Sequence, residues 1–160
     1  MGFLSLGSNL GDRLENLKSA VECLKLRGIT VISESKIYET PARETTSSQG
    51  VYLNMALKIS TELEPSVLLE VCLEIEKSLG RKRPFHHAPR TIDIDILMLG
   101  DLKTDTLHLV IPHPGLEQRD FVIYPLCDIA PEMILPSGMP IIEIKNKLIN
   151  DEIKVYDDGF

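Results

Sequence analysis

The sequence predicts an α+β fold in which helices cover a β-sheet. Residues 51–60 and 92–98 alternate apolar and polar side chains, which is typical of strands with one buried face. Residues 14–24 and 68–79 repeat apolar side chains at helical spacing. With two further apolar runs, the predicted order is strand, helix, strand, strand, helix, strand, the order of the split βαβ arrangement.

The first strand is expected at residues 3–6, and a glycine-rich turn follows it at residues 7–11. Asp12 and Glu15 resemble a capping box, so a helix is expected from there to about Arg27. A glycine-rich turn between a strand and a helix can hold phosphate. This one lacks the spacing of the known phosphate-binding loops, so a plain turn is the favoured interpretation.

The second strand is expected at residues 29–38, which are rich in β-branched side chains, and a polar loop at 39–50 follows it. A loop of that length is usually either a functional lid or disordered. In the third strand, at residues 51–60, Tyr52 and Asn54 share the less apolar face. A ring beside an amide suits a flat heterocycle with hydrogen-bonding edges, and an ordinary half-exposed face is the alternative.

The second helix is expected to begin at Pro65 and to end at Gly80. Cys72 lies in its apolar stripe and is expected in the core. Glu76 lies beside that stripe, where it either contacts a ligand, the favoured interpretation, or faces solvent. The basic segment 81–90 that follows contains two prolines, which exclude a helix or a central strand, and it is a second candidate lid.

The strand at residues 92–98 turns its isoleucines toward the core and Asp93 and Asp95 toward the other face. The two aspartates are about 7 Å apart along the strand, and like charges this close repel unless a cation or water intervenes. A solvated strand face would explain a bare pair of aspartates. Arg90, within the basic segment, favours a second explanation, which is Mg²⁺ bound together with a polyphosphate.

The C-terminal part adds an extension to this ferredoxin-like arrangement. A short strand is expected at residues 107–111, and helices are expected at 119–127 and 141–149. His113 lies between two prolines, and histidine is the residue type that ordinarily titrates near neutral pH, although a lone histidine is more often structural than catalytic. No linker or internal repeat is visible, so residues 1–160 are expected to form one domain.

Composition excludes several classes of protein. Of 160 residues, 43% are hydrophobic and 26% charged, with a net charge of −7, which argues against a general nucleic-acid binder. No apolar run approaches the roughly 20 residues that span a bilayer, so no membrane partner is expected. Cys23, Cys72 and Cys127 form no CxxC pair and are expected as reduced thiols in a cytoplasmic protein.

Several segments together resemble the 6-hydroxymethyl-7,8-dihydropterin pyrophosphokinase family of folate biosynthesis. They occur in the family's order and cover roughly residues 3–135. The segments are Gly7-Ser8-Asn9-Leu10, Tyr38-Glu39-Thr40-Pro41, Tyr52-Leu53-Asn54, Ile75-Glu76, Leu79-Gly80-Arg81, Pro89-Arg90-Thr91-Ile92-Asp93-Ile94-Asp95, Ile111-Pro112-His113-Pro114 and Arg119-Asp120-Phe121. The segment from Pro89 to Asp95 is the most specific of them.

The resemblance implies transfer of the β,γ-pyrophosphoryl unit of ATP to the hydroxymethyl oxygen of the pterin, with release of AMP. It implies that Asp93 and Asp95 hold a pair of Mg²⁺ ions and that Asp95 assists deprotonation of the hydroxyl. Arg90 would grip the phosphates with help from Arg81, so both join Asp95 as expected catalytic residues. The residues expected at the nucleotide are Glu76, Arg83, Arg90, His113 and Arg119.

The resemblance also implies a pterin site. Tyr52 and Phe121 would sandwich the ring, while Asn54 and nearby backbone would read its hydrogen-bonding edge. The full expected set is Thr40, Pro41, Arg43, Tyr52, Asn54 and Phe121. We expect a monomer whose partners are ATP and 6-hydroxymethyl-7,8-dihydropterin, with no nucleic acid.

The chain departs from many family members at His87 and Ala88 and from some at His108 and Val110, which affects nucleotide affinity and lid closure more than the reaction. Alternatives to the enzyme are a catalytically silent binding module, an RNA-binding domain and a nucleotide-sugar transferase. The silent module would be supported by loss of Arg90 or of either aspartate, and all are present. An aromatic content of 5% argues against RNA binding, and a sugar transferase leaves Tyr52 and Asn54 unexplained.

Overall fold

The computed structural model describes residues 1–40, 51–80, 91–148 and 152–156, and the structural statements below concern those ranges. The elements in order are β1 (Gly2–Ser8), α1 (Arg13–Leu26), β2 (Thr30–Glu34), β3 (Tyr38–Thr40), β4 (Tyr52–Ser60), α2 (Pro65–Ser78), β5 (Asp93–Leu99), β6 (Thr104–Asp105), β7 (Val110–Ile111), α3 (Asp120–Ile129), α4 (Ile141–Lys147) and β8 (Lys154–Val155).

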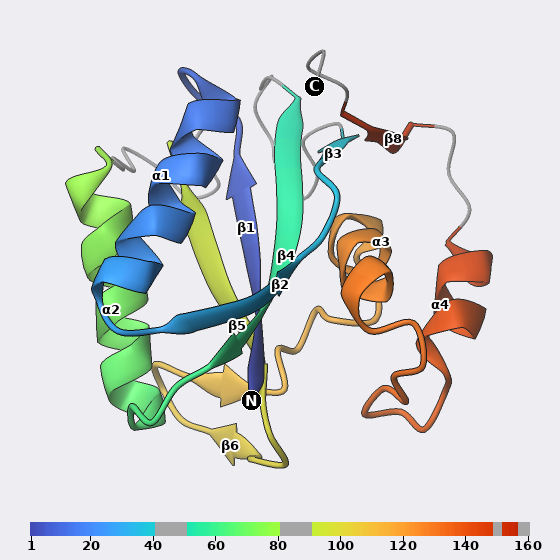
Figure 1. Cartoon of the computed structure of the whole chain (residues 1–160). Helices are drawn as coiled ribbons and strands as arrows, with labels where there is room; N and C mark the ends of the chain where they lie inside the picture. The colour runs from blue at the N-terminus through green and yellow to red at the C-terminus, as the bar shows by residue number, and fades with distance from the viewer. Residues whose placement is uncertain (41–50, 81–90, 149–151, 157–160) are drawn as a thin grey trace.

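The main sheet has the strand order β5-β1-β4-β3-β8, and β2 also pairs with β4 (Figure 1). The strand pairs in this sheet are antiparallel. The order of β5, β1, β4 and β2/β3 is the one expected for a split βαβ sandwich. The predicted ferredoxin-like α+β fold with a C-terminal extension is therefore confirmed.

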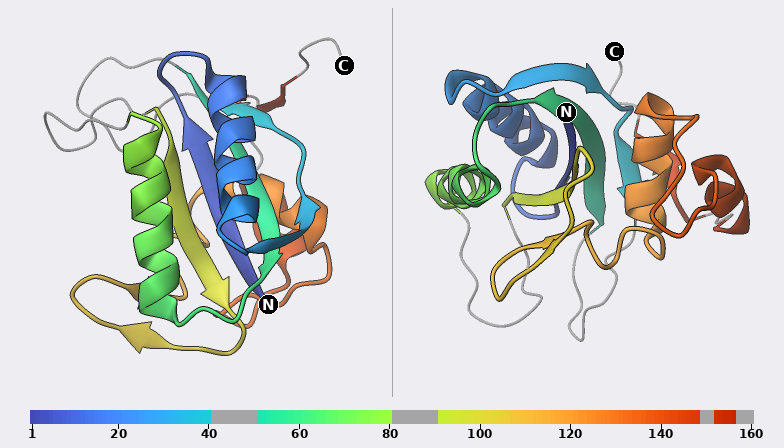
Figure 2. Two further views of the ribbon diagram at one scale, coloured as in Figure 1. Left: turned by 60° about the vertical axis from the view of Figure 1, so that its left-hand side comes forward. Right: turned by 90° about the horizontal axis from the view of Figure 1, so that it is seen from below.

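The two faces of this sheet are covered by different helices. Helices α1 and α2 lie on one face, and α3 and α4 lie on the other, as the view from below shows (Figure 2). Alternate residues of β1, β4 and β5, such as Leu4, Leu57 and Ile94, form the core with α1 and α2. A second apolar cluster, which includes Ile123 and Ile141, joins α3 to α4.

Local signals in the sequence correctly predicted both ends of α1 and the start of α2. The Asp12 carboxylate caps α1 by accepting a hydrogen bond from the Glu15 backbone N–H at 3.1 Å. Gly28 follows this helix with φ of +81°, a conformation that disfavours other residues. Helix α2 begins at Pro65, as expected.

The strand expected at residues 29–38 is divided, because β2 and β3 pair with opposite ends of β4. At the break, the Ser35 hydroxyl accepts the backbone N–H of Ala56, which replaces a regular ladder bond. The strand expected at 107–111 was too long, since it is reduced to β7, which pairs with β6. The short strand β8, which pairs with β3, was not expected.

Cys23, Cys72 and Cys127 carry free thiols, as expected. None of the helices in the described ranges combines the length and apolar character that crossing a membrane requires.

Candidate active site

One row of residues runs across the sheet and joins the expected site residues. Asp93 on β5 is paired with Gly7 on β1, Gly7 with Asn54 on β4, and Asn54 with Tyr38 on β3. Cross-strand partners point to the same face of a sheet. The row therefore lies on the face that α3 covers, opposite the α1–α2 core.

The β5 side of the site is formed by Asp93 and Asp95. Both side chains are partly exposed, and their strand partners on β1 are Gly7 and Ser5. The isoleucine between them, Ile94, is buried in the opposite core. The predicted alternation of this strand is confirmed, and it gives the two carboxylates one common face.

Glu76 lies behind this strand, on α2. Its carboxylate accepts a hydrogen bond from the backbone N–H of Ile94 at 2.7 Å, and the residue is only 2% exposed. Since β5 is at the edge of the sheet, this carboxylate binds the strand between its two aspartates. The solvent-facing alternative for Glu76 is wrong, and the expected nucleotide contact stays a prediction.

Cys72 lies one helical turn before Glu76 and is fully buried, as predicted. Burial, together with the smaller effect of the negative charges of Glu76 and Asp95, raises the pKa of its thiol to about 12. The thiol is therefore neutral at physiological pH and acts as a packing group.

The β4 side of the site is formed by Thr40, Tyr52 and Asn54. The Asn54 carboxamide donates to the Thr40 hydroxyl at 2.8 Å, and both residues are buried, whereas Tyr52 is partly exposed. The alternative interpretation, that Asn54 lies on an ordinary half-exposed strand face, is wrong, because α3 packs over β4. A buried amide held by a hydroxyl presents a fixed hydrogen-bonding edge.

Gly7 separates the β5 side from the β4 side. A Cβ atom at this position would lie 2.9 Å from Asn54 Oδ1 and 3.5 Å from Tyr52 Cδ1. A side chain here would therefore displace the Asn54 carboxamide. The sequence interpretation placed Gly7 in a plain turn and missed this role.

Helix α3 brings Phe121 and Arg119 to the same face of the sheet. The Arg119 guanidinium carbon lies 5.7 Å from the centre of the Phe121 ring, a cation–π arrangement. Arg119 also packs against Gly115, where a Cβ atom would lie 2.6 Å from Arg119 Nε. The structure thus groups the expected nucleotide residue Arg119 with the expected ring-stacking residue Phe121.

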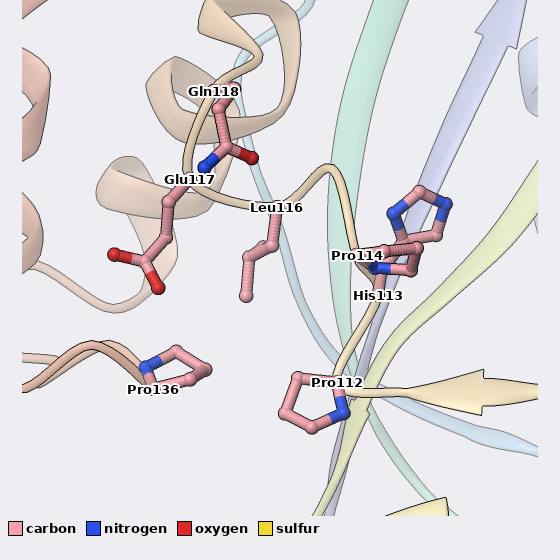
Figure 3. Close-up of a pocket in the computed structure, with 7 residues that line it drawn as sticks. All are labelled: Pro112, His113, Pro114, Leu116, Glu117, Gln118 and Pro136. Carbon is pink, nitrogen blue, oxygen red and sulfur yellow. The ribbon is translucent and has the colours of Figure 1, made fainter. Parts of the chain in front are cut away.

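His113 follows strand β7 and lines a cavity of about 230 Å³ (Figure 3). Its Nδ1 atom accepts the backbone N–H of Gly115 at 3.0 Å. When the imidazole is neutral, this bond places the proton on Nε2. Pro136 faces the histidine loop from the far side of the cavity.

Arg13 was missed by the sequence interpretation. Its guanidinium forms an ion pair with Glu39 at 2.9 Å and donates to the carbonyl of Val51 at 2.9 Å. These residues directly adjoin Thr40 and Tyr52, so Arg13 ties β3 to the start of β4. The helix pattern gave no signal for this, because an arginine in the first turn is usually a solvated residue.

Some expected site residues lie outside the described residues: Pro41, Arg43, Arg81, Arg83 and Arg90, with the divergent positions His87 and Ala88. Their roles stay predictions. The described part of the chain contains no group of three or more histidine, cysteine or acidic side chains suited to a metal. The oxygen donors of Asp93 and Asp95 nevertheless fit Mg²⁺, which often takes one or two carboxylates and completes its shell with water and substrate phosphates.

Comparison with known proteins decides the family. The model of the 7,8-dihydro-6-hydroxymethylpterin-pyrophosphokinase family matches residues 3–131. The chain belongs to this pyrophosphokinase family. It is 45% identical over 147 residues to the 2-amino-4-hydroxy-6-hydroxymethyldihydropteridine pyrophosphokinase of Methylorubrum extorquens, covering 91% of this chain and 92% of that protein. The Aquifex aeolicus enzyme of that name is 43% identical and covers 84% of this chain, with 82% of its own length matched.

The folic acid synthesis protein fol1 of Schizosaccharomyces pombe is 37% identical over 158 residues, which is 98% of this chain. The chain spans only 21% of that relative's length. A solved Plasmodium falciparum HPPK-DHPS structure superposes with a TM-score of 0.70 at 15% identity, covering 92% of this chain and 45% of that one. At that identity the superposition supports the fold of this pyrophosphokinase family member.

Proposed function

We propose that this chain catalyses the Mg²⁺-dependent transfer of pyrophosphate from ATP to the hydroxymethyl group of 6-hydroxymethyl-7,8-dihydropterin in folate biosynthesis. The products are the pterin diphosphate and AMP. The observation that carries the proposal is the row Asp93–Gly7–Asn54 on one face of the sheet. On this face, β1 alone separates the carboxylates of Asp93 and Asp95 on β5 from the Asn54 amide on β4, which can form hydrogen bonds with a heterocycle.

The spacing across this row suits the reaction. Two interstrand distances separate β5 from β4, which is about 10 Å. A pterin ring bound at Asn54 and Thr40 can extend its hydroxymethyl arm over Gly7 toward Asp93 and Asp95. The absence of a side chain at Gly7 leaves this path open.

In the transfer, the hydroxymethyl oxygen forms a bond to the β-phosphorus of ATP. The bond from that phosphorus to the α,β-bridging oxygen breaks, and AMP leaves with the bridging oxygen. Mg²⁺ bound at Asp93 and Asp95 would neutralise phosphate charge and favour ionisation of the hydroxyl. Asp95 would assist by accepting the hydroxyl proton, and positioning with charge neutralisation would supply most of the rate.

The nucleotide would be held from the other side of the site. Arg119 and His113 supply a cation and an N–H donor near α3, and the basic residues Arg81, Arg83 and Arg90 are assigned to the phosphates by family resemblance. In this proposed function, the chain is a single catalytic domain and acts in the cytoplasm as a monomer.

Phosphorus NMR of the protein with ATP, Mg²⁺ and 6-hydroxymethyl-7,8-dihydropterin tests this function. AMP together with a new diphosphate ester on the pterin is expected, and chelation of Mg²⁺ should stop their formation. Formation of ADP would show transfer of a single phosphoryl group and overturn the proposal. Saturable binding of both ligands without turnover would support the silent binding module instead.

A further inference from the structure

Helix α3 connects the candidate site to a second polar contact about 10 Å away along its axis. Phe121 lies in its first turn and Asp128 lies near its end, seven residues later. The Asp128 carboxylate accepts the Tyr38 hydroxyl, whose oxygen lies 3.0 Å from one carboxylate oxygen and 2.9 Å from the other. It also accepts the backbone N–H of Lys36 at 3.2 Å. These bonds tie the start of β3 to the end of α3.

The Tyr38–Asp128 contact is well protected. Tyr38 is 5% exposed, and its ring meets the Tyr124 ring edge-on with centroids 6.0 Å apart. Burial and the neighbouring Asp128 charge raise the pKa of Tyr38, so the phenol remains a hydrogen-bond donor at neutral pH. A bond from a buried hydroxyl to a charged carboxylate is stronger than a neutral one.

Within the first turn of α3, the Asp120 carboxylate accepts the backbone N–H of Phe121 at 2.8 Å, which fixes Phe121 relative to its own helix and not relative to the sheet. Arg119 precedes the helix without capping it through its side chain. Pro125 lies inside the helix and has no N–H to donate to the carbonyl of Phe121, four residues before it. The placement of Phe121 therefore depends on how the whole helix docks on the sheet.

On β3, Tyr38 lies two residues before Thr40, and its strand partner is Asn54. A shift of β3 relative to α3 would change the distance from Thr40 and Asn54 to Phe121. We propose that Tyr38 and Asp128 form a positioning pair. The pair sets the distance between the hydrogen-bonding residues of the pterin site, Thr40 and Asn54, and its aromatic residue, Phe121. This inference rests on the proposed function, because it assigns Phe121 to the pterin.

Steady-state kinetics of Tyr38→Phe and Asp128→Asn test the pair, with Tyr124→Phe as the matched control. Tyr124 lies on the same helix and its hydroxyl donates to the carbonyl of Leu148, which leads away from β3. We expect Tyr38→Phe to raise the KM for the pterin about tenfold, while kcat and the KM for ATP change less than twofold. Tyr124→Phe should leave all three within twofold.

The double variant Tyr38→Phe/Asp128→Asn should be no worse than the more affected single variant, since both substitutions weaken the same hydrogen bond. Equal increases in KM for Tyr38→Phe and Tyr124→Phe would overturn the pairing and indicate general loosening. An unchanged KM in Tyr38→Phe would overturn it as well. If Tyr38→Phe does not fold, Asp128→Asn alone decides by the same criteria, and failure of the wild type to transfer pyrophosphate would contradict the proposed function instead.

Discussion

Only β1 separates the β4 side of the candidate site from its β5 side, yet the two sides are stabilised by different kinds of contact. On the β4 side, buried side chains bind each other, as Asn54 does with Thr40. On the β5 side, Glu76 binds the backbone of Ile94, and the two aspartates are partly exposed. The β4 side thus fixes functional groups directly, whereas the β5 side fixes the strand that carries them.

This difference fits two kinds of ligand. A flat heterocycle is recognised by a preformed hydrogen-bonding edge, because a misplaced buried amide leaves polar groups unsatisfied. A metal with substrate phosphates needs carboxylates that water and ligands can reach. Substitutions on the two sides should therefore separate pterin binding from turnover.

The largest effect is expected on the β5 side. Asp93→Ala or Asp95→Ala should lower kcat by at least about 1,000-fold, since several kcal/mol of charge stabilisation depend on the metal site. The circular dichroism spectrum should stay native. Asp105→Ala, which removes an exposed aspartate from β6, is the control and should keep full activity. Near wild-type turnover of either site variant with Mg²⁺ would disprove the metal assignment.

On the β4 side, Asn54→Ala should raise the KM for the pterin about 10- to 100-fold and change kcat less. It removes the expected ring contact and leaves the buried Thr40 hydroxyl without its partner, at a cost of about 1–3 kcal/mol. Thr40→Ser keeps the hydroxyl and should stay within a few-fold of the wild type. Equal losses in kcat and in pterin affinity for Asn54→Ala would remove the distinction between the two sides.

The boundary between the sides can be tested at Gly7. Gly7→Ala should raise the KM for the pterin about tenfold, because the new Cβ meets Asn54 Oδ1 at 2.9 Å. Gly2→Ala is a matched control on the same strand, where a Cβ would meet Leu99 and the backbone of Met98. It should lower the melting temperature without a selective effect on the pterin. A wild-type KM in Gly7→Ala would show that Asn54 is not held as described.

The smallest effect is expected for substitutions of Glu76, which lies behind β5 on α2. Glu76→Ala should lower the free energy of unfolding by about 1–3 kcal/mol, because the buried Ile94 N–H loses its acceptor. We expect kcat to fall about tenfold and the Mg²⁺ requirement to rise, and Glu76→Gln to restore most of both. Glu74 lies on the same helix as Glu76 and forms an exposed ion pair with Arg27 at the end of α1, so Glu74→Ala should change stability by less than about 1 kcal/mol. A Glu76→Gln variant as impaired as Glu76→Ala would indicate that the charge itself acts on the ligands.

The sequence predicted most of the fold because its signals are local. The alternation around Asp93 and Asp95 and the cap at Asp12 depend on neighbours in the chain, and both were correct. The division between β2 and β3 was missed because it depends on the partner strand β4. Strand β8 was missed because two residues carry too little periodicity to be recognised.

The candidate site was predictable where residue types carry chemistry. Asn54, Asp93 and Asp95 were identified in this way, and they lie on one face of the sheet. Contacts between distant segments could not be predicted, such as Arg13 with Glu39 and Tyr38 with Asp128, because no spacing rule links those positions.

Equilibrium binding of 6-hydroxymethyl-7,8-dihydropterin, followed by its fluorescence without nucleotide or Mg²⁺, tests the division between the two sides most directly. It compares the wild type with Asn54→Ala and Asp95→Ala. We expect Asn54→Ala to weaken binding at least tenfold and Asp95→Ala to change it less than threefold. Equal weakening by the two substitutions would contradict the division and would show that the carboxylates also hold the pterin.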